Sequence, residues 1–417
     1  MSLNRRNFLK SAAGATAVPL VSGCQAAPPA TDDALELEAQ LKAAAAKPVL
    51  HLESLTSPVI IDSIVLLKKG REYMIRVRSK DGAEGLSFSN GRAPYVHPIF
   101  TQRVVPYFIG KDARDLEEHL FGVYRHSSNY KLQGLAYWSC IAWVEYAILD
   151  MLGRIANKSY GELFGGVIRK NVDFYVASGN RDTTPEEEVV FLQELLDETK
   201  ARAVKFRLGG RMNRNVDASP GRSPNLIRLA RKTLGDDIDL HGDSNSSYDP
   251  PQAIEIGRIL EEVNAVYFEE PCPFDRLDDT RRVTEALDIP VSGGEQEYSE
   301  WRFQYAIQHR VVDIVQPDLH YYGGLIRSKR VANMAEVRNM PTTVHISGGF
   351  GFIYMLHFAS FTKDIGKYQE YKRNIERYRD WFSPALEIND GALTVPQGPG
   401  VGIVDIAEVM KGAEVVG

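Results

Sequence analysis

The sequence contains few cysteines, no run of basic residues and, after its first 24 residues, no apolar stretch that we expect to cross a membrane. Three cysteines in 417 residues are too few for a disulfide framework. The net charge of −6, without a stripe of basic and aromatic residues, argues against a nucleic-acid partner. A hydrophobic fraction of 44% and a charged fraction of 25% are ordinary for a globular protein, and the length predicts two domains.

The N-terminus has the pattern of an export signal. Arg5 and Arg6 precede a mildly apolar segment of small residues, as in twin-arginine signals. The segment ends in "VSGC", which resembles a lipobox with Cys24 as the lipidated residue; a disordered cytoplasmic tail is the alternative. We therefore predict a signal over residues 1–24, a tether over residues 25–57 and a periplasmic location, with membrane contact only through a lipid on Cys24.

The next part of the chain has the pattern of a small α+β domain. Residues 59–80 hold two alternating apolar runs around "KKGRE", which predicts a β-hairpin. Residues 85–98 are rich in glycine, proline and aromatic residues, and we expect a mobile loop there. Residues 112–163 carry apolar residues at helical spacing. These features predict a capping domain over residues 58–170.

From residue 171 onward, strand-like and helix-like segments alternate. Eight short strands with seven intervening helices predict a closed parallel barrel. The predicted fold class is α/β, a (β/α)7β TIM-like barrel over residues 171–380 with an N-terminal α+β capping domain. Residues 381–417 are rich in glycine and proline, and we expect this C-terminal tail to return and complete the capping domain.

Acidic residues recur at the ends of three consecutive predicted strands. Asp243, Glu269 and Glu295 are 26 residues apart (269 minus 243, 295 minus 269), which is about one βα unit. The carboxyl ends of barrel strands meet at one mouth, so these carboxylates would repel each other there. A divalent cation removes this conflict, and all-oxygen ligands favour Mg²⁺, with Mn²⁺ as a substitute. A single acid at a strand end is more often a helix cap or a loop charge.

The later strand ends carry groups suited to proton transfer. Asp318 and His345 end the sixth and seventh predicted strands, so the carboxylate can hold one imidazole nitrogen and leave the other as a base. Glu370 ends the eighth strand. On the second strand, Lys205 and Arg207 are two residues apart and share one face, beside the predicted metal.

A metal and cations around a carboxylate substrate suit removal of the proton next to that carboxylate, which is the pattern of enolase-type enzymes. The chain resembles the mandelate racemase subgroup of the enolase superfamily over roughly residues 58–410. The motifs that carry the resemblance are "KFR", "GDSN", "FEEP", "GGE", "QPD", "VHIS" and the tail "GALTVPQGPGVGI".

The resemblance implies roles for individual residues. It makes Asp318 and His345 the catalytic dyad, and it makes the three spaced carboxylates the Mg²⁺ ligands, with Glu270 in a supporting position. It matches Lys205 to the first lysine of the family's K-x-K motif. Glu370 matches an acid that hydrogen-bonds the enediolate.

One residue departs from the family pattern. Arg207 stands where mandelate racemase has its second basic lysine, and an arginine stays protonated. We therefore favour a dehydratase of a sugar acid (aldonate or aldarate): His345 removes the proton α to the carboxylate to give a metal-stabilised enediolate, and the β-hydroxyl then leaves to give a 2-keto-3-deoxy acid. A depressed pKa would let Lys205 act as a second base, so a racemase, epimerase or cycloisomerase is the alternative. A non-catalytic exported sugar-acid binding lipoprotein is a third possibility.

Substrate contacts are expected from the capping domain and the barrel mouth. Arg92 and His97 lie in the 85–98 segment, and Asn245 follows Asp243; all three are candidate substrate-binding residues, although a polar loop residue is as often plain surface. We expect a small-molecule sugar-acid substrate, no nucleic-acid partner and a homo-oligomer.

Overall fold

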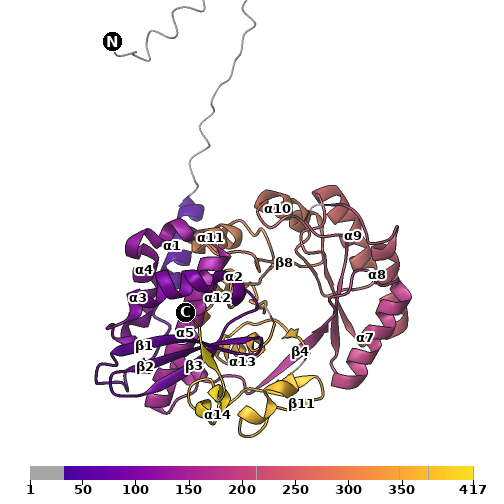
Figure 1. Ribbon diagram of the computed structural model, residues 1–417. Helices are drawn as coiled ribbons and strands as arrows, with labels where there is room; N and C mark the ends of the chain where they lie inside the picture. The colour runs from indigo at the N-terminus through magenta and orange to yellow at the C-terminus, as the bar shows by residue number, and fades with distance from the viewer. Residues whose placement is uncertain (1–31, 213, 347, 374, 417) are drawn as a thin grey trace, which may run out of the picture. The chain divides into compact units, whose positions relative to one another are not determined.

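The computed structural model describes residues 32–212, 214–346, 348–373 and 375–416 (Figure 1). The predicted signal over residues 1–24, including Cys24, lies outside the described residues. Glu38–Gly417 form one compact unit that contains both the predicted capping domain and the predicted barrel.

The later part of the segment predicted as a tether is packed. Helix α1 (Asp32–Ala45) buries Leu41, Ala44 and Ala45 near its C-terminal end. The backbone N–H groups of Val49 and Leu50 donate to Glu117 Oε1, at 3.0 and 2.9 Å. A buried helix end and backbone hydrogen bonds are not features of an unattached linker, so the ordered part of the protein begins well before residue 58.

The capping domain is a four-stranded antiparallel sheet covered by helices. The sheet order is β13-β1-β2-β3, and the predicted 59–80 hairpin is formed by β1 and β2. The expected loop over 85–98 is wrong, because β3 and α2 occupy most of it. The elements are β1 (Ile61–Lys69), β2 (Glu72–Ser79), β3 (Glu84–Phe88), α2 (Ala93–Ile99), α3 (Val105–Phe108), α4 (Leu116–Arg125), α5 (Leu135–Ala156), α6 (Tyr160–Leu163) and β13 (Glu414–Val415).

Helix α5 is the central helix of the capping domain. It is long and apolar enough to cross a membrane by length and composition, but most of it is buried inside the protein, as expected for a core helix. Gly85 of β3 packs directly on it: a Cβ at Gly85 would lie 2.2 Å from the carbonyl oxygen of Ala147. Two of its carboxylates are buried and hold other segments. Glu145 accepts the N–H of Ile326 at 3.1 Å, and Asp150 accepts the N–H of Leu86 at 2.8 Å.

The barrel has the predicted alternation of strands and helices, with the helices on the outside (Figure 1). Its strands are β4 (Asn171–Ala177), β5 (Ala203–Arg207), β6 (Asp239–Asp243), β7 (Tyr267–Glu269), β8 (Val291–Gly293), β9 (Ile314–Val315) and β10 (Gln369–Tyr371). Its helices are α7 (Pro185–Thr199), α8 (Arg222–Leu234), α9 (Pro250–Glu262), α10 (Leu277–Ala286), α11 (Glu300–Gln308), α12 (Leu325–Val337) and α13 (Gly351–Phe361).

Parallel pairing runs in order from β4 to β9, and β10 pairs with β4 to close the ring. The seventh predicted strand is not a regular one. It is joined to the β9 segment by isolated bridges, Val315 with Thr342 and Asp318 with His345. The barrel prediction is confirmed, and the seventh strand position is held by these bridges.

The sequence sets the helix starts that turn the chain back along the barrel. Thr184 caps α7 with a reciprocal bond to Glu187, and Pro185 occupies the first turn. Asp249 caps α9, followed by Pro250. Proline is favoured at such starts because its missing N–H has no partner in a first turn. Each capped helix start therefore fixes one end of the loop that joins the preceding strand to its helix at the mouth of the barrel.

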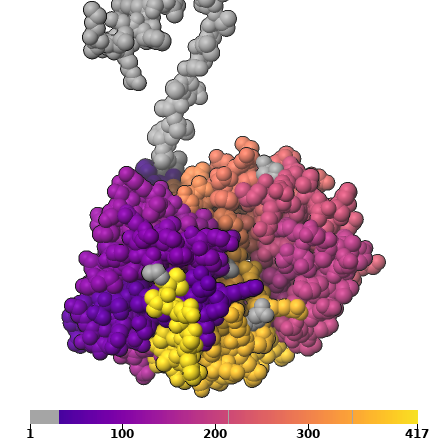
Figure 2. Space-filling view, in the orientation of Figure 1, coloured from indigo at the N-terminus to yellow at the C-terminus, as the bar shows by residue number. Residues whose placement is uncertain are grey.

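The C-terminal tail contributes to both domains. β13 pairs antiparallel with β1, so the tail completes the capping sheet as predicted. The hairpin of β11 (Ile388–Asn389) and β12 (Ala392–Thr394) adds to the start of β4 in the barrel, which the sequence did not indicate. Figure 2 shows the last residues, in yellow, against the indigo residues of the cap.

Candidate active site

Strand register brings the predicted site residues to one level. In the parallel sheet Arg207 is paired with Asp243, and Asp243 with Glu269. Lys205 lies one pleat below Arg207 on the same strand. These four side chains, all buried, therefore point from three neighbouring strands into the same end of the barrel.

Lys205 is the centre of a buried ion network. Its Nζ donates to both oxygens of Glu269 at 3.0 Å and lies 3.2 Å from Glu370 Oε1 and 3.6 Å from Asp243 Oδ2. Burial would lower the pKa of this lysine, but the charges of Glu269 and Glu370 raise it overall. The depressed pKa that would let Lys205 act as a base is not found in this geometry.

Arg207 contacts the same group of acids from the mouth side. Its guanidinium touches Asp243 and donates to Asn245 Oδ1 at 3.2 Å. Asn245 Nδ2 in turn lies 3.4 Å from Glu270 Oε2. The predicted substrate ligand Asn245 thus sits at the mouth and orients the arginine that replaces the family's second lysine.

The predicted dyad is formed. His345 Nδ1 lies 2.6 Å from Asp318 Oδ2, and Asp318 Oδ1 accepts the N–H groups of His320 and Tyr321 at 2.8 and 2.7 Å. Burial would raise the pKa of Asp318, but the bond to His345 lowers it, so the carboxylate stays ionised. The histidine ring is therefore fixed, with Nε2 turned away from Asp318.

Three charged side chains surround that second nitrogen. Glu295 Oε2 is 3.3 Å, Lys372 Nζ 3.5 Å and Glu370 Oε2 3.7 Å from His345 Nε2. Burial would lower the pKa of His345; Glu295 and Glu370 raise it above its usual value, and Lys372 opposes them. Strand β10 and the residue that follows it thus contribute a carboxylate and an amine to the environment of the imidazole.

Glu370 contacts a cation on each of two sides. It is fully buried between Lys205 on one side and Lys372 on the other, whose Nζ is 3.5 Å from Oε2. Burial would raise the pKa of this carboxyl, but the surrounding cations hold it well below its usual range. Glu370 is therefore a permanent negative charge beneath His345.

The three predicted metal ligands fit a divalent cation by their chemistry, although they do not share one point. Within the described ranges no group of three His, Cys, Asp or Glu side chains has the placement of a metal site. Two of these carboxylates instead face a protein cation, Asp243 facing Arg207 and Glu269 facing Lys205, and Glu295 faces the imidazole of His345. Asp243 Oδ2 lies against Arg207 and Glu295 Oε2 lies 3.3 Å from His345 Nε2, and both oxygens are buried without a hydrogen bond of ordinary geometry. They would bind a hard cation once these contacts open.

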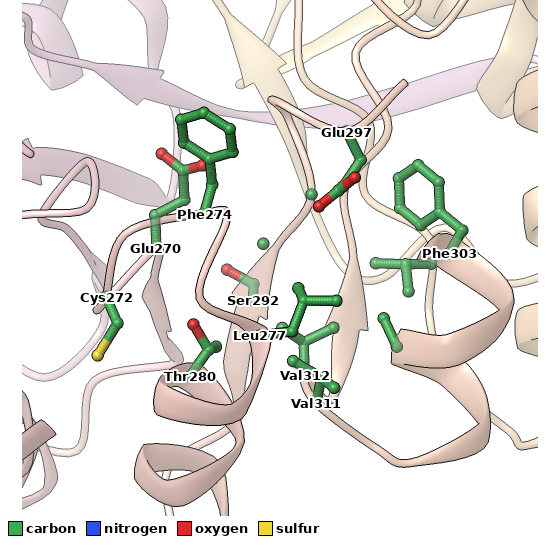
Figure 3. A pocket seen from close by; sticks show the side chains of 14 residues that line it. Glu270, Cys272, Phe274, Leu277, Thr280, Ser292, Glu297, Phe303, Val311 and Val312 are labelled. Atoms are coloured by element: carbon green, nitrogen blue, oxygen red, sulfur yellow. The ribbon is translucent and has the colours of Figure 1, made fainter. Parts of the chain in front are cut away.

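Glu270 belongs to a different environment from Glu269. It lines a cavity of about 40 Å³ beside strands β7 and β8, together with Cys272, Phe274 and Ser292 (Figure 3). This volume admits one or two water molecules, so the cavity is not a substrate site. Burial, with Glu295 and Glu269 nearby, raises the pKa of Glu270 well above its usual value.

The capping domain reaches the barrel beside the dyad. Arg92 Nε donates to Tyr321 Oη at 3.2 Å, three residues after Asp318. His97 is stacked on Tyr73 within the cap and does not reach the mouth through any described contact. Of the two predicted cap residues, Arg92 is thus the one that contacts the barrel.

A larger cavity of about 240 Å³ lies between cap and barrel. It is lined by cap residues 71–73 and 88–91 and by barrel residues 348–350 and 377–378. The 348–350 segment follows His345 in the sequence, while the dyad residues themselves are not among those that line this cavity. Its volume approaches that of small-molecule sites, about 300–1,000 Å³.

Two site residues were not predicted from the sequence. Gln316 donates to Glu269 Oε2 at 3.2 Å, and Lys372 lies beside His345. The alternation of side chains along a strand could have indicated both residues. Gln316 precedes Asp318 by two residues, and Lys372 follows Glu370 by two residues, so each pair shares a strand face.

Comparison with known proteins identifies the family. Residues 187–408, more than half of the chain, match the enolase C-terminal domain-like model. Residues 51–165 match the N-terminal domain of mandelate racemase / muconate lactonizing enzyme. The chain belongs to the mandelate racemase/muconate lactonizing enzyme group of the enolase superfamily. Residues 2–22 of this family member match the twin-arginine translocation signal sequence, in agreement with the predicted signal.

Named relatives of this enolase-superfamily chain include dehydratases and a cycloisomerase. Arabinonate dehydratase of Saccharolobus solfataricus is 31% identical, over 73% of this chain and 80% of the relative. D-galactarolactone cycloisomerase of Agrobacterium fabrum is 27% identical, over 79% and 88%. A crystal structure from Roseobacter denitrificans is 33% identical with a TM-score of 0.79, and the match covers 86% of this chain and 99% of that one.

Proposed function

We propose that this protein is a Mg²⁺-dependent dehydratase of an aldonic or aldaric acid. The observation that carries the proposal is the His345–Asp318 pair, whose free nitrogen faces the same barrel end as three buried carboxylates. A base beside a cation site is what removal of a proton α to a carboxylate requires. The arabinonate dehydratase relative supports elimination of water as the outcome.

Asp243, Glu269 and Glu295 would hold the cation. When bound, it draws electron density from the substrate carboxylate and so makes the α-proton more acidic. Two features of the chain fit a bound cation. The oxygens of Asp243 and Glu295 are buried without a hydrogen bond of ordinary geometry, and the charge of Asp243 is offset by Arg207.

Each of the other site residues has a separate role in the proposed reaction. Asp318 fixes the ring of His345, so that Nε2 takes the proton from C2 of the substrate. Lys205 and Arg207 present fixed positive charge to the negative charge that develops on the substrate carboxylate. Glu370 holds Lys205 in place from below.

Dehydration is favoured over racemisation because of the residues on the side of the site opposite His345. Racemisation needs a second base there, but Arg207 stays protonated and the pKa of Lys205 is raised by Glu269 and Glu370. A cycloisomerase is the second candidate, supported by the D-galactarolactone cycloisomerase relative, because it needs only one base and an internal leaving group.

Substrate selection is proposed to come from the cap. Arg92, bonded to Tyr321, and the cavity beside residues 348–350 lie where the distal part of a sugar acid would extend from the dyad. Asn245 is proposed to contact the substrate at the metal side through its position beside Arg207.

Incubation of the purified protein with Mg²⁺ and a panel of aldonic and aldaric acids in deuterated buffer tests this function. Formation of a 2-keto-3-deoxy acid supports the dehydratase. Deuterium in an epimerised acid without loss of water, or ring opening of a lactone, supports an isomerase instead. Binding of an acid without exchange or conversion supports a binding lipoprotein.

We further propose that the twin-arginine signal delivers the folded protein to the periplasm, where a lipid on Cys24 anchors it. Folded export suits a protein that assembles a metal site before it leaves the cytoplasm. Cell fractionation of the wild type and of Cys24→Ser tests the anchor: the variant is expected in the soluble periplasmic fraction and the wild type in the membrane fraction.

A further inference from the structure

Lys372 is a charged residue beside the reacting nitrogen of His345, and the proposed reaction does not yet use it. It directly follows strand β10 and shares the face of Glu370. Its Nζ donates to the backbone carbonyl of Ile346 and lies 3.5 Å from both His345 Nε2 and Glu370 Oε2. Three contacts therefore hold this ammonium at the histidine.

The cations of the site differ in their access to a substrate. The side chain of Lys205 is fully buried and occupied by three carboxylates, whereas the side chain of Lys372 is 31% exposed. Arg207 stays protonated and cannot give up a proton. Among these three, Lys372 is the one that combines an ammonium proton, an opening to the mouth and proximity to His345.

We propose that Lys372 is the general acid that protonates the departing β-hydroxyl, so that base and acid act from the same side of the substrate. This inference rests on the proposed dehydration and assigns the source of the proton that the leaving hydroxyl needs. In an eclipsed C2–C3 bond, the C2 hydrogen and the C3 oxygen are adjacent, and two groups 3.5 Å apart can reach both.

The step balances without a further reactant. His345 Nε2 takes the proton from C2, and the electron pair of that bond first passes onto the substrate carboxylate. The pair then forms the C2–C3 double bond as the C3–O bond breaks, and the C3 oxygen leaves as water with a proton from Lys372 Nζ. The enol becomes the 2-keto acid by taking the proton held on His345 at C3 and releasing its hydroxyl proton to solvent, and solvent returns a proton to the lysine amine.

The geometry also predicts the stereochemistry of the reaction. Because His345 and Lys372 lie on one side, elimination is syn.

The decisive experiment compares Lys372→Met with wild type on two leaving groups. On the panel acid that wild type dehydrates, the variant should lose about 10²–10⁴-fold in dehydration, which is the usual contribution of a general acid. It should retain exchange of the C2 proton in deuterated buffer within about threefold, since His345 is unchanged. On the 3-deoxy-3-fluoro analogue, fluoride leaves without an acid, so wild type and variant should eliminate it at similar rates.

Other outcomes separate the possible failures. Equal losses with hydroxyl and fluoride, or parallel loss of exchange and dehydration, would show that Lys372 only shapes the site. Wild-type dehydration in Lys372→Met would also overturn the proposal. Lys367→Met, an exposed lysine paired with Asp239 away from His345, is the matched control and should resemble wild type in every assay. No exchange or elimination by wild type on any panel acid would overturn the proposed function itself.

Discussion

His345 Nδ1 lies 2.6 Å from Asp318 Oδ2, and the two residues are joined by a backbone bridge across neighbouring strand positions of the barrel. The carboxylate thereby selects the tautomer whose free lone pair is on Nε2, the nitrogen that faces Glu295, Lys372 and Glu370. Asp318 is itself held by two backbone N–H groups, so the ring orientation is set before a substrate binds.

Asp318→Asn tests this orientation. The amide can donate to Nδ1 and so favours the wrong tautomer, and turnover is expected to fall about 10²–10⁴-fold with little change in KM. Steady-state kinetics on the panel acid that wild type converts measures this. Asp313→Asn, a change at the opposite end of the β9 segment from Asp318, should leave kcat near wild type. An unaffected Asp318→Asn would contradict the role of the dyad.

Addition of Mg²⁺ tests the three carboxylates. Mg²⁺ should raise the unfolding free energy, by about 2.7 kcal/mol when its concentration is a hundred times its Kd, and EDTA should reverse this. Calorimetry and thermal melts of Asp243→Asn and Glu295→Gln should show weakened binding. Glu297→Gln, whose carboxylate is paired with Arg302, is the control. Unchanged Mg²⁺ binding in both ligand variants would place the cation elsewhere.

Lys205→Met tests the buried network without a substrate. It leaves Glu269 and Glu370 without their closest cation, and loss of one partner of a buried pair typically costs about 3–5 kcal/mol of unfolding free energy. Urea titration in EDTA measures it. Lys363→Met removes an exposed lysine paired with Glu336 and should change stability little. Equal stability of the two variants would show that Lys205 does not hold the site together.

The barrel and the order of its polar strand ends could be predicted from the sequence because both follow from a repeat of about one βα unit. The same regularity gave Asp318 and His345, although their segment forms only isolated bridges. The contacts within the site could not be predicted this way. That Lys205 bonds Glu269 while Arg207 touches Asp243 depends on side-chain reach across three strands, which spacing does not encode.

The predictions of a loop and of a linker were wrong because the local composition of both segments resembled that of irregular chain. The Gly- and Pro-containing 85–98 segment suggested a loop, but Gly85 is required where β3 packs against Ala147 and Met151 of α5, and proline is compatible with the first turn of α2. The 25–57 segment looked like a linker because it is rich in alanine and charge, yet its backbone is tied to Glu117, a partner far along the chain.

Glu145 predicts a pH-dependent stability. Burial raises its pKa to about 8, from an ordinary value of about 4.3. Between these values the folded state holds a proton that the unfolded chain has lost. The contribution of this group to unfolding free energy is therefore complete below about pH 4.3 and falls as the pH rises to about 8, by at most about 1.4 kcal/mol per unit.

Glu145→Gln should remove this slope while keeping an oxygen for the N–H groups that begin α12. The stability of wild type relative to the variant should decline from pH 5 to pH 8 and then level off, as measured by urea titration at several pH values. Glu118→Gln on exposed α4 should keep the wild-type profile. A constant difference between wild type and Glu145→Gln would show that this carboxyl does not titrate with folding.

Exchange of the C2 proton in deuterated buffer, compared between wild type and His345→Asn with Mg²⁺ and the panel acids, tests the central claim most directly. His345 is expected to be the base, so wild type should exchange the proton and release a 2-keto-3-deoxy acid, while the variant should do neither and still bind Mg²⁺. Retained exchange in His345→Asn would contradict the account, because another residue would then be removing the proton.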